Sequence, residues 1–154
     1  MKTYDVTVCD NKKVEWRFDG KLHREDGPAI EYSDGSKVWY LNDKLHRIDG
    51  PAVEYPDGSK LWYINNKSHR VDGPAIEYAD GSKVWCLNGK LHREDGPACE
   101  YAKGGKLWYL NDVKQTEQEH ARKTRAKKTC LMIDGKEIEI SGETIENLKK
   151  ALNL

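Results

Sequence analysis

The five tryptophans of this chain lie at a constant interval of 23 residues, at Trp16, Trp39, Trp62, Trp85 and Trp108. Four His-Arg pairs keep the same interval, at His23-Arg24, His46-Arg47, His69-Arg70 and His92-Arg93. Four Gly-Pro-Ala triplets do so as well, beginning at Gly27, Gly50, Gly73 and Gly96. A fixed period of this length is the signature of a repeat protein, in which each unit packs on its neighbours. The sequence therefore predicts four successive repeats over residues 14–111.

Each repeat contains two short turn sequences whose residues tolerate a positive φ angle. The first turn has two residues, as in Asp19-Gly20, Asn42-Asp43, Asn65-Asn66 and Asn88-Gly89. The second has three residues, as in Ser33-Asp34-Gly35, Pro56-Asp57-Gly58, Ala79-Asp80-Gly81 and Lys103-Gly104-Gly105. Two tight turns in every repeat leave only short extended segments between them. We therefore predict a mainly β fold, an antiparallel β-hairpin repeat solenoid.

The lengths of these turns determine which residues face each other across the strands. The first turn of the second repeat places Trp39 opposite His46. The second turn predicts an ion pair in each repeat: Glu31 with Lys37, Glu54 with Lys60, Glu77 with Lys83 and Glu100 with Lys106. An apolar pair lies beside each ion pair, and matched cross-strand pairs stabilise a sheet by about 0.2–1 kcal/mol each.

Alternation along the strands gives the predicted sheet two different faces. In the second repeat the predicted core face carries Val38, Tyr40, Leu45, Val53 and Tyr55. The opposite face, an aromatic and charged surface, carries Trp39, Leu41, His46, Ala52, Glu54 and Lys60. A bulge in the His-Arg-x-Asp-Gly-Pro segment would exchange the two sides locally, and this alternative stays open.

The 23-residue period, the Trp-x-x-Asn-Gly-Lys-x-His segment from Trp85 to His92 and the Tyr-x-Asp-Gly-Ser turns resemble the MORN repeat. The resemblance covers residues 14–111 and implies a single-layer antiparallel hairpin solenoid that binds proteins or lipids and performs no chemistry. MORN units usually have Gly directly after the His, whereas Arg-x-Asp-Gly-Pro-Ala follows here. This variant is similar to repeats in many bacteriophage proteins, whose arrays also end on a segment similar to residues 115–120.

Different sequence patterns flank the repeats. Alternating apolar residues in residues 1–13 predict an N-terminal capping strand. Residues 112–128 are predicted to form a basic helix or linker, in which Thr116-Glu117-Gln118-Glu119 has the form of a capping box. In residues 129–154, two alternating segments followed by an apolar helical stripe predict a ββα cap. The oligomeric state stays open, with a dimer through this C-terminal cap as one alternative.

Composition narrows the functional classes without naming a partner. The 26 Lys and Arg residues balance 26 Asp and Glu residues, so net charge favours no partner. No apolar run approaches the roughly 20 residues of a membrane span, and no apolar signal segment follows Met1. We therefore expect a soluble protein in the cytoplasm of a host cell. Cys9, Cys86, Cys99 and Cys130 show no Cys-x-x-Cys pair and are expected to be free thiols.

The His-Arg-x-Asp clusters are interpreted as structural and not catalytic. Catalysis needs different residues that converge in one cleft, whereas each repeat offers one His, about 10 Å from the next across two strand spacings. That distance also prevents shared metal ligation, so we expect no enzyme activity, no metal and no cofactor. The aspartates of these clusters are expected to accept hydrogen bonds from the Arg or the backbone of their own turn: Asp26, Asp49, Asp72 and Asp95.

The remaining hypothesis is a binding protein. Trp, Tyr and Arg dominate protein-binding hot spots, and the predicted partner-binding residues are Trp39, Trp62, Trp85, His46, His69, Arg47, Arg70 and Arg93. With the resemblance to phage repeats, they favour a phage-encoded inhibitor that covers a surface of a host defence complex, such as an anti-CRISPR protein. The alternative is nucleic-acid or nucleotide binding by the Arg and Trp residues or by a basic run. The candidate contacts in that run are Arg122, Lys123, Arg125, Lys127 and Lys128.

Overall fold

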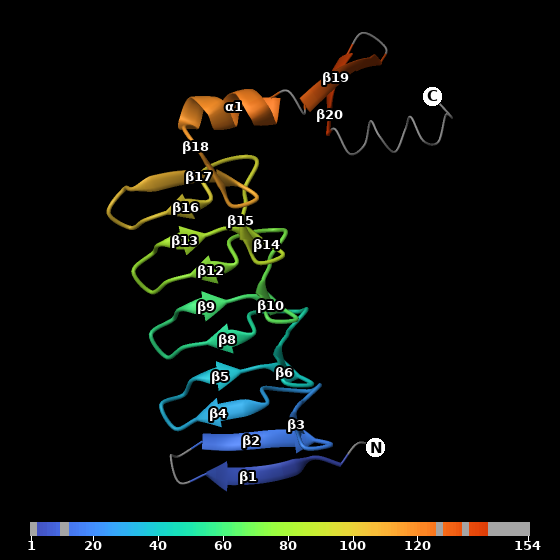
Figure 1. The fold of residues 1–154 in the computed structure, drawn as a ribbon, viewed down its shortest axis with the longest axis vertical. Coiled ribbons are helices and arrows are strands. Elements are labelled where there is room, and N and C mark those ends of the chain that lie inside the picture. The colour runs from blue at the N-terminus through green and yellow to red at the C-terminus, as the bar shows by residue number, and fades with distance from the viewer. Residues whose placement is uncertain (1–2, 10–12, 126–127, 134–135, 142–154) are drawn as a thin grey trace. The chain divides into compact units, whose positions relative to one another are not determined.

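A computed structural model of the chain describes residues 3–9, 13–125, 128–133 and 136–141, the last two ranges by their backbone alone. The chain is mainly β, with antiparallel hairpins in a sheet and, within the described residues, one helix in its C-terminal part (Figure 1). This confirms the predicted fold class at that level. The chain divides into two compact units, Met1–Lys114 and Gln115–Leu154. No helix of the described ranges has the length and apolar character needed to span a bilayer.

One sheet of 12 strands runs through the repeats. Its main path follows chain order from β1 (Asp5–Cys9) and β2 (Lys13–Phe18) through β4 (Ile30–Tyr32), β5 (Lys37–Val38), β8 (Val53–Glu54), β9 (Lys60–Leu61), β12 (Ile76–Glu77), β13 (Lys83–Val84), β16 (Cys99–Glu100) and β17 (Lys106–Leu110) to β18 (Val113–Gln115). The twelfth strand, β3 (Lys21–Leu22), pairs with β2. Neighbouring strands from β1 to β17 pair antiparallel, so the path is a meander.

A second row of small hairpins accompanies this sheet. It consists of β6 (Tyr40–Leu41) with β7 (Lys44–Leu45), β10 (Tyr63–Ile64) with β11 (Lys67–Ser68), and β14 (Cys86–Leu87) with β15 (Lys90–Leu91). In Figure 1 the small hairpins lie along one side of the large ones. The chain passes from one row to the other at a tryptophan, as the second repeat shows. The N–H of Trp39 donates to the Ala52 carbonyl at 2.8 Å, next to the large hairpin, and the Trp39 carbonyl accepts from the His46 N–H at 3.2 Å, in the small hairpin. The sequence predicts uninterrupted strands there, and this break is a correction.

The predicted cross-strand register is confirmed, but the predicted Glu–Lys ion pairs are not: the carboxylates of Glu31, Glu54, Glu77 and Glu100 pair instead with Arg24, Arg47, Arg70 and Arg93. Lys37, Lys60, Lys83 and Lys106 lie opposite Glu31, Glu54, Glu77 and Glu100, each beside an apolar pair. The predicted turns are confirmed too: both residues of each two-residue turn have positive φ, for example 51° at Asn42 and 61° at Asp43. Two consecutive residues with positive φ are typical of the type I′ turn, whose twist matches that of the strands it joins.

The core face is confirmed apart from one tyrosine. Ile30, Val38 and Val53 form a buried apolar cluster, against which Leu22, Tyr40, Leu45 and Leu61 pack. Tyr55, predicted to belong to this core, is 46% exposed because it lies at the end of the hairpin. Ala52, assigned to the opposite surface, is fully buried, since its carbonyl accepts the Trp39 N–H and its small side chain lies at that corner.

Each two-residue turn after the first also binds the preceding repeat. Asp43 donates its backbone N–H to the Leu22 carbonyl at 3.0 Å, and its side chain accepts the Leu22 N–H at 2.8 Å. The same double contact joins Asn66 to Leu45, and Asp112 to Leu91. In the remaining repeat the turn residue is Gly89, which keeps only the backbone bond, to Ser68 at 2.8 Å.

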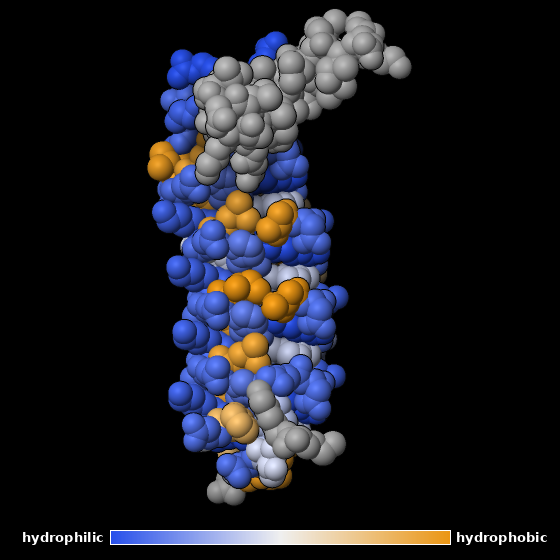
Figure 2. Space-filling view, turned by 90° about the vertical axis from the view of Figure 1, so that its right-hand side faces the viewer, coloured by the Kyte–Doolittle hydropathy of each residue, from blue (hydrophilic) through white to orange (hydrophobic). Residues whose placement is uncertain are grey.

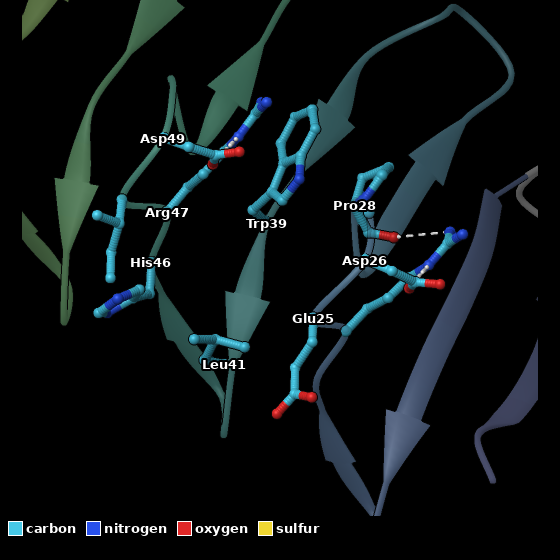
Figure 3. A pocket seen from close by; sticks show the side chains of 11 residues that line it. Glu25, Asp26, Pro28, Trp39, Leu41, His46, Arg47 and Asp49 are labelled. Atoms are coloured by element: carbon cyan, nitrogen blue, oxygen red, sulfur yellow. Dashed lines mark hydrogen bonds and ion pairs between the residues drawn. The ribbon is translucent and has the colours of Figure 1, made fainter. Parts of the chain in front are cut away.

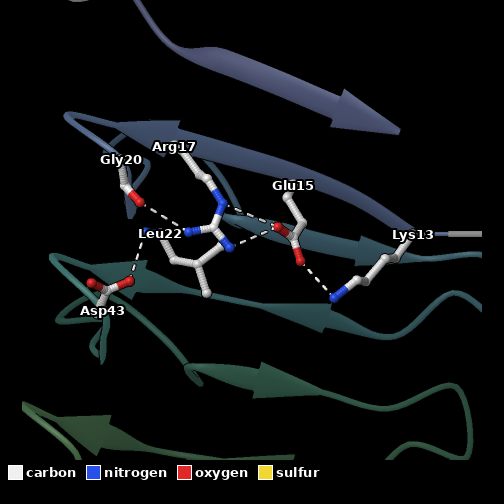
Figure 4. A network of polar contacts seen from close by, with 6 residues as sticks. All are labelled: Lys13, Glu15, Arg17, Gly20, Leu22 and Asp43. Carbon is white, nitrogen blue, oxygen red and sulfur yellow. Dashed lines mark hydrogen bonds and ion pairs between the residues drawn. The ribbon is translucent and has the colours of Figure 1, made fainter. Parts of the chain in front are cut away.

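The apolar core ends at the N-terminal side in a network of charges (Figure 4). Glu15 stands where the following repeat has Val38, and it lies between Lys13 at 2.5 Å and Arg17 at 2.9 Å. Arg17 also donates to the Gly20 carbonyl. Lys13 and, next, Arg17 hold the pKa of the buried Glu15 carboxyl below its ordinary value. The network therefore replaces the apolar residues of later repeats at the end where no further repeat covers them.

The C-terminal unit contains α1 (Glu117–Arg125) and a hairpin of β19 (Lys128–Ile133) and β20 (Lys136–Ser141). The predicted capping box is confirmed: Glu119 donates its N–H to Thr116 Oγ1, and Thr116 donates its N–H to Glu119 Oε2. These bonds satisfy backbone N–H groups that a helix start leaves unpaired. The last helix of the predicted ββα cap lies outside the described residues.

Replacing Gly89 with Asn should stabilise the chain. The φ angle of Gly89 is +83°, near that of Asn66, and a Cβ there would meet no atom closer than 3.6 Å. The new side chain can accept the Ser68 N–H, and one such bond contributes about 0.5–1.5 kcal/mol. Urea unfolding followed by tryptophan fluorescence measures the gain. Gly89→Ala is the control, which has the positive φ without the acceptor and should be destabilised; equal losses in both variants would contradict the prediction.

Glu15→Gln should reduce stability in a pH-dependent manner. Because the folded-state pKa of Glu15 is lowered, its ionised form stabilises the fold above the unfolded-state pKa, and this contribution is lost as pH falls through the folded-state pKa. The variant should therefore unfold at lower urea than wild type at about pH 7 and at nearly the same urea at about pH 3. A constant difference at both pH values would assign the loss to packing and not to charge.

Candidate functional site

An arginine lies over a tryptophan ring in every repeat. The guanidinium carbon is 4.3 Å from the ring centroid for Arg24 and Trp16, 4.0 Å for Arg47 and Trp39, 4.0 Å for Arg70 and Trp62, and 3.9 Å for Arg93 and Trp85. Such cation–π contacts contribute about 0.5–2 kcal/mol each. The structure thus brings the predicted partner-binding Arg and Trp residues together as pairs within their own repeats.

The same guanidinium holds the loop that carries it. Arg47 donates from Nε to Asp49 at 3.0 Å and from Nη1 to the Pro51 carbonyl at 3.2 Å and to Glu54 at 2.9 Å. Its side chain is 22% exposed. Arg24, Arg70 and Arg93 make the corresponding contacts in their repeats. The predicted role of the aspartates is confirmed, and each arginine charge is neutralised inside its repeat.

The position of the arginine explains why Asp and Gly follow it in this loop. The hydrogen bond from Arg47 holds the pKa of Asp49 below its ordinary value, so the carboxylate stays charged at neutral pH. A Cβ on Gly50 would come 2.9 Å from the guanidinium carbon of Arg47, closer than atoms normally approach. A Cβ on Gly27, Gly73 or Gly96 would likewise come 2.8 to 3.0 Å from the guanidinium carbon of the arginine in the same loop. A side chain at these positions would therefore displace the guanidinium from its place across the loop.

The histidines link neighbouring repeats. His46 Nδ1 lies 3.0 Å from Asn65 Oδ1, and His69 Nδ1 lies 3.0 Å from Asn88 Oδ1, each Asn being the first turn residue of the next repeat. Both predicted partner-binding histidines therefore serve contacts inside the fold. Within the described ranges, no three His, Cys, Asp or Glu side chains gather as a metal site would require.

The outward-facing residues of these loops were not predicted as site residues. We call the segments 24–26, 47–49, 70–72 and 93–95 the loop row. The residue between Arg and Asp is Glu25, Ile48, Val71 or Glu94, and Ile48 is 85% exposed while Val71 is 83% exposed. The neighbouring Asp side chains are 75% to 84% exposed. The sequence signal that marks them is an apolar residue, in the two central repeats, at a loop position that holds Glu in the outer two.

A groove of about 540 Å³ lies between the loops of the first two repeats. Figure 3 shows the Trp39 ring between the loop of Arg47 and Asp49 and the loop of Asp26 and Pro28. Ile48 and Glu25 also line this groove. Figure 2 shows apolar patches that recur along one face of the repeats, each surrounded by polar side chains. Within the loop row, the exposed side chains of Ile48 and Val71 lie next to the exposed carboxylates of Asp49 and Asp72.

The described cysteines are free thiols, and two of them are buried. Cys9, Cys86 and Cys99 form no disulfide, as predicted, and the side chain of Cys130 lies outside the described residues. Burial raises the pKa of Cys86 and of Cys99, which disfavours the reactive thiolate at neutral pH.

The basic run is only partly described. Arg122, Lys123 and Arg125 are exposed on α1, and Lys123 donates to Gln115 at 2.5 Å. Lys128 begins β19, while Lys127 lies outside the described residues. The run thus keeps at least two exposed guanidinium groups on one helix.

Arg47→Lys should destabilise the fold although it preserves the charge. A lysine ammonium lacks the planar fork that covers the Trp39 ring while it reaches the Pro51 carbonyl, and the loss should be about 1–2 kcal/mol. Urea unfolding measures it. The control is Lys44→Arg, at the exposed start of β7 in the same repeat, which should leave stability unchanged. Wild-type stability of the Arg47 variant would show that charge alone holds the loop.

The sequence matches no protein-family model and no curated protein. What the chain does has therefore to be inferred from the arginine network and the loop row themselves.

Proposed function

We propose that the chain is a non-enzymatic protein-binding scaffold, and that the loop row forms its contact surface. The main observation behind this proposal is that Ile48 and Val71, in the loops of adjacent repeats, are 85% and 83% exposed. Neighbouring exposed apolar residues with a polar border are typical of protein contact sites, where a central anchor is surrounded by groups that exclude water.

The charges of the loop row favour a protein over a nucleic acid. Each arginine of the row is partly buried and bonded to carboxylates of its own repeat, as Arg47 is to Asp49 and Glu54. The groups that extend outward are carboxylates, which repel phosphates. A basic or neutral protein surface with an apolar centre suits this arrangement.

The repetition of one network favours binding over catalysis. Four repeats carry the same Arg, Trp, Asp and Glu contacts, and an active site instead requires different groups that converge on one substrate. The described polar groups of the loops are engaged with each other, which suits a rigid support for exposed side chains.

At a finer level, we propose a MORN-like hairpin solenoid that acts in a host cell by covering a surface of a host defence complex. The resemblance of the repeats to those of bacteriophage proteins supports this choice of partner, as for an anti-CRISPR inhibitor. Trp39, Trp62 and Trp85, with their arginines and histidines, then serve mainly to hold the loops in position.

The alternative proposal is nucleic-acid or nucleotide binding through the basic run. It is favoured by one observation, the exposure of Arg122, Lys123 and Arg125 on α1.

The proposal is tested by capturing partners on the immobilised full chain from nuclease-treated bacterial extract. A protein should be retained, and the Ile48→Ser, Val71→Ser double variant should weaken its binding about tenfold or more, because hot-spot truncations typically cost over about 1.4 kcal/mol. The matched control is Tyr55→Ser with Tyr78→Ser, which removes exposed apolar groups from the same two repeats at the other turn. This control should bind as wild type does.

Two results would contradict the proposal. Nuclease treatment could remove all binding, or Ala at Arg122, Lys123, Arg125, Lys127 and Lys128 could abolish it. Oligonucleotide affinity that falls steeply between roughly 50 and 200 mM salt would then establish the alternative.

A further inference from the structure

The first strand of the sheet has an open edge. β1 ends the strand order, and among the described residues no strand pairs with its outer side. Two of its side chains are exposed apolar groups, Val6 at 54% and Val8 at 75%. Both lie on the face of Val14 and Trp16, their cross-strand partners in β2.

The hydrogen bonds of β2 show which backbone groups of β1 point outward. Trp16 donates its N–H to Ala29 and accepts from His23, both on the side away from β1. In an antiparallel ladder, opposite residues alternate between pairs that exchange both bonds and pairs that exchange none. Val6, which lies opposite Trp16, therefore directs its N–H and C=O outward, and Val8 does the same two residues further.

This edge lacks the protection that natural edge strands usually carry. Such strands are kept from pairing by lysines, prolines or bulges. β1 has the sequence Asp-Val-Thr-Val-Cys, with its one charge, Asp5, at the start. At the other end of the sheet, β18 is three residues long and includes Lys114.

We propose that β1 pairs antiparallel with β1 of a second copy of the chain, around a twofold axis at Thr7. Val6 then exchanges backbone hydrogen bonds with Val8 of the partner subunit, for about four bonds across the axis. The four valine side chains meet on one face of the joined sheet, next to Val14 and Trp16 of each copy. Closed twofold pairing is the commonest form of self-association.

The charges of β1 favour its own copy as the occupant. In this register Asp5 lies opposite the partner's Cys9, and Thr7 lies opposite the partner's Thr7, so no like charges meet among the residues of β1. The inference is independent of the loop row, because it uses the edge of the sheet and none of the residues 24–26, 47–49, 70–72 and 93–95.

Sedimentation velocity of the full chain tests the pairing. At about 100 µM, where micromolar dimers are saturated, the wild type should have twice the monomer mass of 17.7 kDa. Val8→Lys places a charge in the valine cluster and should restore the monomer mass. The matched control is Val113→Lys, at a valine 58% exposed near the opposite edge, which should remain dimeric. A monomeric wild type, or a dimeric Val8→Lys chain, would overturn the proposal.

A disulfide test examines the register even if the lysine variant fails to fold. Residues 5 and 9 are about 13 Å apart along one strand and cannot bridge within a chain, whereas opposite non-hydrogen-bonded residues have Cα atoms about 4.5 Å apart, within disulfide range. With oxidised glutathione, Asp5→Cys should give a covalent dimer through the partner's Cys9 on a non-reducing gel. Asp5→Cys with Cys9→Ser should not. Equal cross-linking of the two chains, or none in either, would refute the Thr7-centred register.

Discussion

The contact between each arginine and its tryptophan determines most of the repeat. Trp39 marks the point where the chain leaves the main sheet for the small hairpin, and Arg47 covers its ring from the returning loop. Because the guanidinium also binds Asp49 and crosses close to Gly50, the Asp and Gly of this loop are explained by the same arginine. The residues that recur most regularly in the sequence are therefore those that contact each other within one repeat.

The sequence predicts the strand register well because local chemistry determines it. Positive φ at residues such as Asn42 and Asp43 and the pairing of Glu54 with Lys60 need only turn lengths and alternation. The bend at Trp39 could not be predicted in this way. Alternation passes unbroken from Val38 to Tyr40, and the bend depends on bonds to Ala52 and His46 that local sequence does not reveal.

The candidate site was harder to predict for a related reason. Recurrence shows that Arg47 and Trp39 are needed, but it does not show whether they contact a partner or each other, and the structure shows that they contact each other. Ile48 and Val71 break the pattern of their column, and their exposure depends on how the loop closes around the arginine. Sequence prediction thus identified the framework and overlooked the side chains that the framework presents.

The residue between Arg and Asp can be substituted more freely than its neighbours in the loop. The bonds of Arg47 to Asp49, Pro51 and Glu54 close the loop through its neighbours, so the side chain at position 48 can change without reopening it. Each repeat then offers one replaceable side chain, about 10 Å from the corresponding side chain of the next repeat. Under the proposed binding role, single substitutions at this position would change the specificity of the surface, and duplication of a repeat would add one more contact residue without a new fold.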